Sequence, residues 1–134
     1  MMKHLQNMIV LGLALVVLAC NSYGEKVEYN GTEVYYSEDV SKAIADEVGA
    51  YLVEMEFADG STKSVQITKD SLYNFRMVTQ EKYHNDTSMD INFQALGMLL
   101  SQEVFDGEPI TFVICDNTFQ EARSIQINGS KLKS

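Results

Sequence analysis

An Asn-Gly pair separates two short alternating runs near the start of the chain, and it constrains the fold more than any other local feature. The runs cover residues 27–29 and 32–36, with Asn30 and Gly31 between them. A two-residue hairpin turn needs positive φ at both central positions, which asparagine and glycine adopt more readily than other residues. The sequence therefore predicts an antiparallel β-ribbon at the start of the folded domain.

Beyond the ribbon, the spacing of apolar residues predicts two helices and four strands. The helices are expected over residues 40–55 and 89–104, and the strands over residues 63–68, 72–79, 109–115 and 123–127. Gly49 interrupts the first helical pattern, and the alternation of Val53, Met55 and Phe57 is also typical of a strand. Residues 51–57 are therefore either helix or strand, and we favour helix.

Counted from the second strand of the ribbon, the predicted order is β-α-β-β-α-β with one added edge strand. This order is that of the ferredoxin-like or split βαβ arrangement. It predicts an α+β fold in which an antiparallel sheet carries both helices on one face. Residues 27–134 are long enough for one hydrophobic core and too short for two, so we expect a single domain.

The first residues of the chain have the layout of a secretory signal peptide. A weakly basic start precedes an uncharged, apolar run from Met8 to Ala19, as such signals require. The run is shorter than the roughly 20 apolar residues of a membrane-spanning helix. We therefore expect residues 1–19 to direct export and then to be removed.

The end of this run, Val17-Leu18-Ala19-Cys20, resembles the lipobox of bacterial lipoproteins. The resemblance implies that the Cys20 thiol receives a diacylglycerol, and that cleavage leaves Cys20 as the first residue, with residues 20–26 as lipid attachment and tether. It also implies a lipid-anchored protein of the cell envelope, and Asn21 after the cysteine weakly favours the outer membrane. Small residues at Ser22 and Gly24 suit an ordinary signal peptidase, so a soluble secreted or periplasmic product cut before Glu25 remains an alternative.

Acidic residues outnumber basic ones, at 19 against 10, and give a net charge of −9. Nucleic-acid binding depends largely on Lys and Arg that neutralise phosphates, so nucleic acid is not an expected partner. Anionic lipid headgroups are disfavoured for the same reason. Attachment to a membrane would therefore come from lipid on the N-terminus rather than from charge.

Few residues suggest chemistry. His84, Asp86 and Asp90 are the weak candidates for a metal site, although zinc normally takes three or four protein ligands and this spacing matches no established motif. We expect His84 and Asp86 to be solvated loop residues and Asp86, Thr87 or Ser88 to cap a helix. A metal-dependent hydrolase around His84 is kept as an alternative, but we expect no enzymatic activity and no cofactor.

Arg76 is a lone cation on a predicted strand of an acidic protein. With Tyr73 and Asn74 it forms a speculative binding group, because arginine and tyrosine are enriched at interfaces. Gln66, Asn74, Arg76 and Gln126 are expected on the open face of the sheet. Cys115 follows an apolar run and is expected to be a buried free thiol.

Several stretches resemble a bacterial domain family of uncharacterised function, over most of residues 31–127. They are Val34-Tyr35-Tyr36, Lys63-Ser64-Val65-Gln66, Phe75-Arg76-Met77-Val78, Val104-Phe105-Asp106-Gly107-Glu108-Pro109 and Ile114-Cys115-Asp116. The resemblance implies a genuine α+β domain and carries no activity, substrate or catalytic residue across. We therefore expect a lipid-anchored envelope or cell-surface protein whose domain works by binding, as an adaptor to a protein partner in the envelope.

Overall fold

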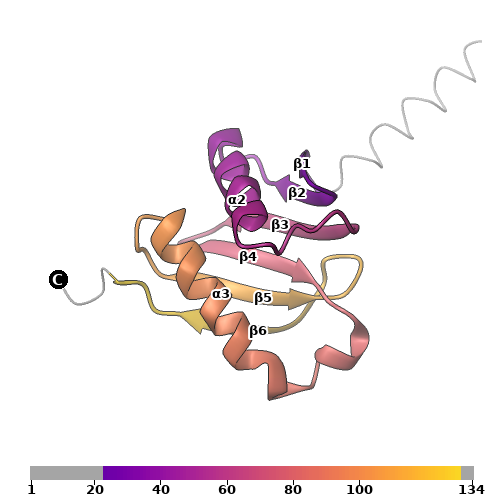
Figure 1. Ribbon diagram of the computed structural model, residues 1–134. Coiled ribbons are helices and arrows are strands. Elements are labelled where there is room, and N and C mark those ends of the chain that lie inside the picture. Colours follow the sequence, from indigo (N-terminus) through magenta and orange to yellow (C-terminus); the bar gives the residue numbers. More distant parts are fainter. Residues whose placement is uncertain (1–22, 131–134) are drawn as a thin grey trace, which may run out of the picture.

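The computed structural model describes residues 23–130, so the predicted signal peptide and Cys20 lie outside the described residues. The chain forms one six-stranded sheet with two long helices on one of its faces (Figure 1). The elements in order are β1 (Glu25–Tyr29), β2 (Thr32–Tyr36), α2 (Lys42–Glu54), β3 (Lys63–Lys69), β4 (Tyr73–Val78), η1 (Glu81–Tyr83), η2 (Thr87–Met89), α3 (Asp90–Glu103), β5 (Ile110–Cys115) and β6 (Glu121–Ile127). None of the described helices is long and apolar enough to cross a membrane.

The α+β class, the N-terminal ribbon and the placement of both helices on one face are confirmed, whereas the predicted antiparallel, ferredoxin-like sheet is wrong. The strands follow the chain order from β1 to β6, and the β2/β3 and β4/β5 pairs are parallel. In the ferredoxin-like order, the first strand of the β-α-β-β-α-β unit has a later strand on each side. Here β1 already occupies one edge of β2, so only one neighbour can be added and the interleaved order cannot form.

The Asn-Gly turn has the predicted geometry and also contacts the loop between α2 and β3. Asn30 and Gly31 have φ values of 49° and 87°. The Asn30 side chain donates a hydrogen bond to the Ala58 carbonyl oxygen at 3.0 Å, and the Gly60 amide donates to the Asn30 carbonyl oxygen at 2.9 Å. The hairpin turn thereby fixes the start of β3 beside β2.

The first helix begins at Ser41, whose side chain accepts a hydrogen bond from the Ile44 amide at 3.2 Å. It continues to Glu54, so residues 51–54 are helical as favoured, and no strand forms over residues 55–57. Gly49 is explained by packing rather than by a break, because a Cβ there would collide with the ring of Tyr29. Gly97 plays the same part in α3, where a Cβ would lie 2.7 Å from the Ile127 side chain.

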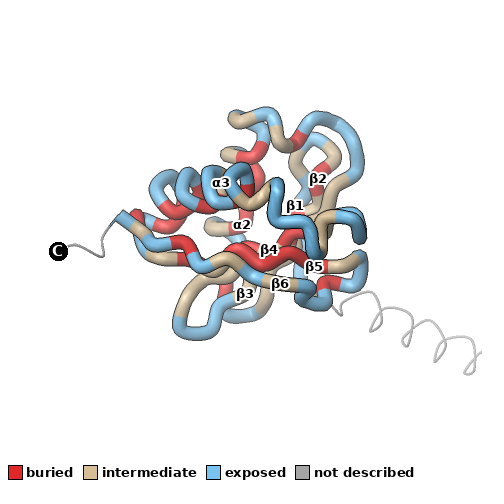
Figure 2. Tube along the Cα trace, turned by 90° about the horizontal axis from the view of Figure 1, so that it is seen from below, coloured by how far each residue is buried: buried red, intermediate tan, exposed pale blue. Residues whose placement is uncertain are grey.

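Both helices lie towards the outer strands of the sheet: α2 packs on β1 and β2, and α3 packs on β5 and β6. The buried side chains between the helices and the sheet form the main core, which contains Val34, Leu52, Ile67, Phe75, Leu100, Phe112 and Ile127 among others. Burial is greatest along β5, whereas most of β6 is exposed (Figure 2). The strand β1 begins at Glu25, inside the segment predicted as tether.

Replacing Gly31 by alanine should destabilise the protein more than the same change at Gly60. Both residues have positive φ, which costs an L-residue about 1–2 kcal/mol. A Cβ on Gly31 would also lie 2.7 Å from the Ser61 carbonyl oxygen, whereas one on Gly60 meets only the Asn30 side chain at 3.9 Å. Urea denaturation of Gly31→Ala and Gly60→Ala measures the difference, and equal losses of stability would show that the turn does not pack on this loop.

Candidate functional site

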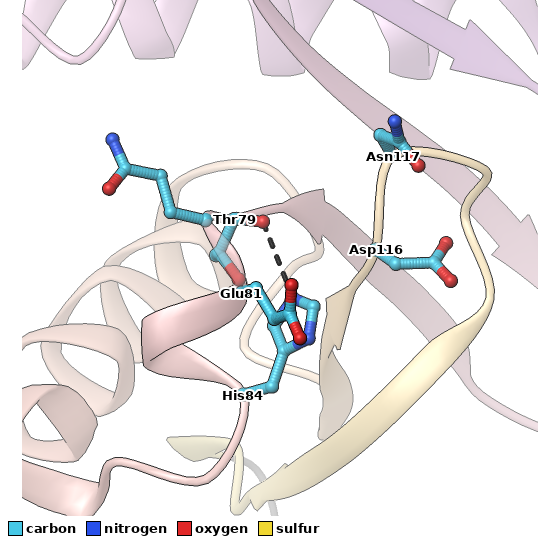
Figure 3. Close-up of a pocket in the computed structure, with 6 residues that line it drawn as sticks. Thr79, Glu81, His84, Asp116 and Asn117 are labelled. Carbon is cyan, nitrogen blue, oxygen red and sulfur yellow. Dashed lines mark hydrogen bonds between the residues drawn. The ribbon is translucent and has the colours of Figure 1, made fainter.

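A polar depression of about 490 Å³ lies where the parallel strands β4 and β5 end, and it contains the predicted histidine (Figure 3). Its lining comes from the segment after β4 and from the turn after β5. The lining residues are Thr79, Gln80, Glu81, His84, Asp116 and Asn117. Ligands often bind at the carboxyl ends of parallel strands, so the position suits a site.

The groups in this depression are not arranged for shared chemistry. The His84 ring nitrogen Nε2 lies 3.3 Å from the Thr79 carbonyl oxygen. Asp116 accepts hydrogen bonds from the Thr118 hydroxyl, the Thr118 amide and the Gln120 amide, and these donors hold the pKa of its carboxyl below the usual value. The Asp116 carboxylate points away from His84 (Figure 3), and its oxygens serve the turn that they cap.

Each of the three candidate metal ligands has a different interaction partner. Asp86 accepts a hydrogen bond from the Ser88 amide at 2.9 Å and so caps η2 rather than α3, and Asp90 forms an ion pair with Arg123 at 2.7 Å. Arg123 also donates to the carbonyl oxygens of His84 and Asp86, at 2.9 and 3.0 Å. Within residues 23–130, no cluster of three or more His, Cys, Asp or Glu side chains could hold a metal ion.

Arg123, which sequence reasoning passed over, therefore fixes the loop that carries His84. The pairing of Arg123 with Ile114 places its side chain on the helix-covered face of the sheet. The available signal was the alternation of β6, in which Arg123, Ile125 and Ile127 share one face.

The three residues of the predicted binding group, Tyr73, Asn74 and Arg76, do not lie on one face of the sheet. Tyr73 lies on the helix-covered face, where its ring is 4.7 Å from that of Phe105. Asn74 faces the other side and donates to the Thr68 hydroxyl at 3.1 Å. Successive strand residues point to opposite faces, so the sheet separates Tyr73 from Asn74 and Arg76.

Arg76 lies on the open face as expected, but its guanidinium is occupied. Its Nε donates to the Gln66 side chain at 3.1 Å, and its Nη2 donates to the Phe119 carbonyl oxygen at 2.6 Å. The ring of Phe119 packs with those of Tyr23 and Tyr35, and we call these three rings the aromatic cluster. Tyr23 falls in the predicted tether, so nothing in the sequence pattern pointed to it.

An apolar groove crosses the helix-covered side between the end of α2 and the first half of α3. It consists of two adjoining hollows of about 370 and 340 Å³ that share Phe57, Met77, Met89 and Phe93. We call this site the methionine groove and define it by the six apolar residues of the second hollow, Met55, Phe57, Met77, Met89, Phe93 and Leu96. Both volumes fall within the usual range for ligand sites.

Two charged side chains line the methionine groove, Lys63 at the rim of one hollow and Glu56 at the rim of the other. The Lys63 ammonium lies 4.9 Å from the centre of the Phe57 ring and 3.2 Å from the Asp59 carboxylate, and it donates to the Phe57 carbonyl oxygen. Glu56 lines the second hollow and has no ion pair with any described residue. The lysine is therefore neutralised while the glutamate is not.

Cys115 is the buried free thiol that the sequence predicted, with 0% of its surface exposed. Burial raises the pKa of the thiol to about 11. The side chain packs with Val113 and Phe119 on the open face. Cys115 is therefore a packing residue and a poor nucleophile in the folded protein.

The stability of the protein should fall with increasing pH above about 9, in part because of Cys115. The unfolded chain forms thiolate above its ordinary pKa near 9, whereas the folded chain keeps the thiol neutral until pH about 11. The contribution of Cys115 is complete below pH 9 and is lost by pH 11, a change of about 2–3 kcal/mol. Urea denaturation at several pH values should show a shallower loss for Cys115→Ala, and equal slopes would contradict the assignment.

Comparison with known proteins identifies a family whose description names no activity. A family model described as the AF_1994_N family N-terminal domain matches residues 26–127, from β1 to the end of β6. No curated protein and no solved structure matches the chain. The family match agrees with the expectation of an uncharacterised domain family. A function has to be inferred from the geometry of the structure.

Proposed function

We propose, from the premise that the chain belongs to the AF_1994_N family, that it is a lipid-anchored binding protein of the cell envelope. Its site is the methionine groove, and its ligand is an apolar segment of a partner protein. The observation that carries this proposal is the groove itself, an open apolar hollow between two helices. Methionine side chains are flexible and polarisable, and they recur on surfaces that accept partner helices.

Charge favours a basic amphipathic helix as the partner segment. All 19 acidic residues of the chain lie between Glu25 and Glu121, whereas three of its 10 basic residues lie outside residues 23–130. At the rim, Lys63 is neutralised by Asp59, and Glu56 has no such counter-ion among the described residues. An anionic ligand would find no available cation there, while lysines or arginines beside an apolar helix face would meet an acidic surface.

The packing of Tyr23 supports cleavage before Cys20 rather than before Glu25. A cut before Glu25 would remove a ring that contacts both Tyr35 and Phe119. It would also remove the Tyr23 carbonyl oxygen, which accepts a hydrogen bond from the Gln66 side chain. Cleavage before Cys20 keeps the aromatic cluster intact and leaves the thiol available for lipid.

The intact mass of protein purified from its native membrane fraction tests the anchor. We expect a mass above that of residues 20–134 by a glyceride with several acyl chains, because one chain alone binds a membrane only marginally. The Cys20→Ala variant should lack this addition. A bare chain that begins at Glu25 would instead identify a soluble secreted or periplasmic protein.

The methionines themselves report on binding. Met55, Met77 and Met89 line the groove, whereas Met98 is 53% exposed on the outer side of α3. With ¹³C-labelled methionine methyl groups, titration with a helical peptide of leucine and lysine should shift the three groove signals and leave that of Met98 unchanged. An unchanged spectrum, or a shift of Met98 alone, would overturn the proposed site, and shifts caused only by lauric acid would identify a lipid-binding groove instead.

A matched pair of variants tests whether the groove holds the peptide. Met89→Lys should weaken binding roughly ten-fold or more, because the new charge would be desolvated against apolar side chains. Met98→Lys adds the same charge outside the groove and should leave the affinity unchanged. Equal affinities for the two variants would place the peptide elsewhere.

A further inference from the structure

Three aromatic rings hold the start of the domain on the face of the sheet that the helices leave uncovered. The Tyr23 ring lies edge-on to Tyr35 and Phe119, with centroid distances of 5.6 and 5.1 Å. Tyr35 and Phe119 also contact each other, at 5.8 Å. Edge-to-face rings at these distances attract one another, so Tyr23 is docked rather than free.

A chain of hydrogen bonds reinforces this docking. The Gln66 amide donates to the Tyr23 carbonyl oxygen at 3.1 Å, and the Gln66 oxygen accepts from Arg76 Nε at 3.1 Å. Arg76 Nη2 in turn donates to the carbonyl oxygen of Phe119. Arg76, the lone cation of its strand, thus joins both sides of the aromatic cluster and ties residue 23 to the middle of the sheet.

The docking of Tyr23 limits the reach of any N-terminal anchor. Cys20 precedes Tyr23 by three residues, which span about 11 Å at most when fully extended. A chain anchored at Cys20 therefore cannot carry the domain far from the bilayer. The tether also leaves the domain from the face that carries the aromatic cluster.

We infer that the open face of the sheet around Tyr23, Tyr35 and Phe119 rests against the membrane surface, and that the methionine groove faces away from it. This inference rests on the proposed lipid anchor at Cys20. The two tyrosines suit contact with a membrane surface, because the amphipathic ring of tyrosine is favoured at the boundary between lipid and water. The helices lie on the opposite face of the sheet (Figure 1), which presents the groove to partners that approach from the aqueous side.

Fluorescence quenching on vesicles tests this orientation, because the chain contains no tryptophan and one can be introduced as the only reporter. Gln120→Trp places it beside Phe119 at an exposed position, and Met98→Trp places it on the outer side of α3. The lipidated proteins are reconstituted in phosphatidylcholine vesicles that contain a lipid with a nitroxide-labelled headgroup. We expect several-fold stronger quenching at position 120 than at position 98.

A third protein combines Gln120→Trp with Tyr23→Ala and tests the docking of the tether. Its quenching should fall towards that of Met98→Trp, because the freed tether no longer fixes the orientation. Equal quenching at positions 120 and 98 in proteins whose mass shows the lipid would overturn the orientation and leave the anchor intact. An intact mass without lipid would overturn both the anchor and the orientation.

Discussion

The close approach of each helix to an outer strand is the contact on which the rest of the architecture depends. At Gly49 the helix α2 meets the Tyr29 ring of β1, and at Gly97 the helix α3 meets the Ile127 side chain of β6, with no room for a Cβ at either position. Tyr29 also donates a hydrogen bond to Asp46 at 2.7 Å, which holds the ring against the helix. These contacts keep α2 over the β1 edge and α3 over the β6 edge of the same face of the sheet. The methionine groove occupies the space that remains above Met77 of the central strand β4.

Local chemistry predicted the elements well, and the pairing of the strands much less. Positive φ at Asn30 and Gly31 and the burial of Cys115 both follow from residue type and spacing. Strand order does not, because alternation tells which face a residue occupies and not which strand lies beside it. The occupied edge of β2 was nevertheless implied by the predicted ribbon, and it excludes the interleaved order.

The two crossover connections distinguish this sheet from the ferredoxin-like arrangement. Strands β2 and β3 run opposite to β4 and β5, yet both connections step in the same direction across the sheet with their helices on one face. The two crossovers therefore have opposite hands. Most such connections are right-handed, so one of the two crossovers has the rarer left hand.

The candidate sites were harder to predict than the fold, because side chains at core spacing can also line a groove. Phe93 and Leu96 lie within the second predicted helix, and the approach of Met55, Phe57 and Met77 to them depends on tertiary packing. The partners of Arg76, Gln66 and Phe119, likewise depend on tertiary packing, because they are distant in the sequence.

The openness of the methionine groove in solution is the central claim, and methionine oxidation tests it most directly. The folded protein is treated with hydrogen peroxide, and each methionine is followed by mass spectrometry, because oxidation requires access to the sulfur. Half-buried Met55 and Met89 should oxidise more slowly than Met98 but clearly faster than Met77, which is 6% exposed. Protection of Met55 and Met89 as complete as that of Met77 would mean that the groove is closed and would contradict the proposed site.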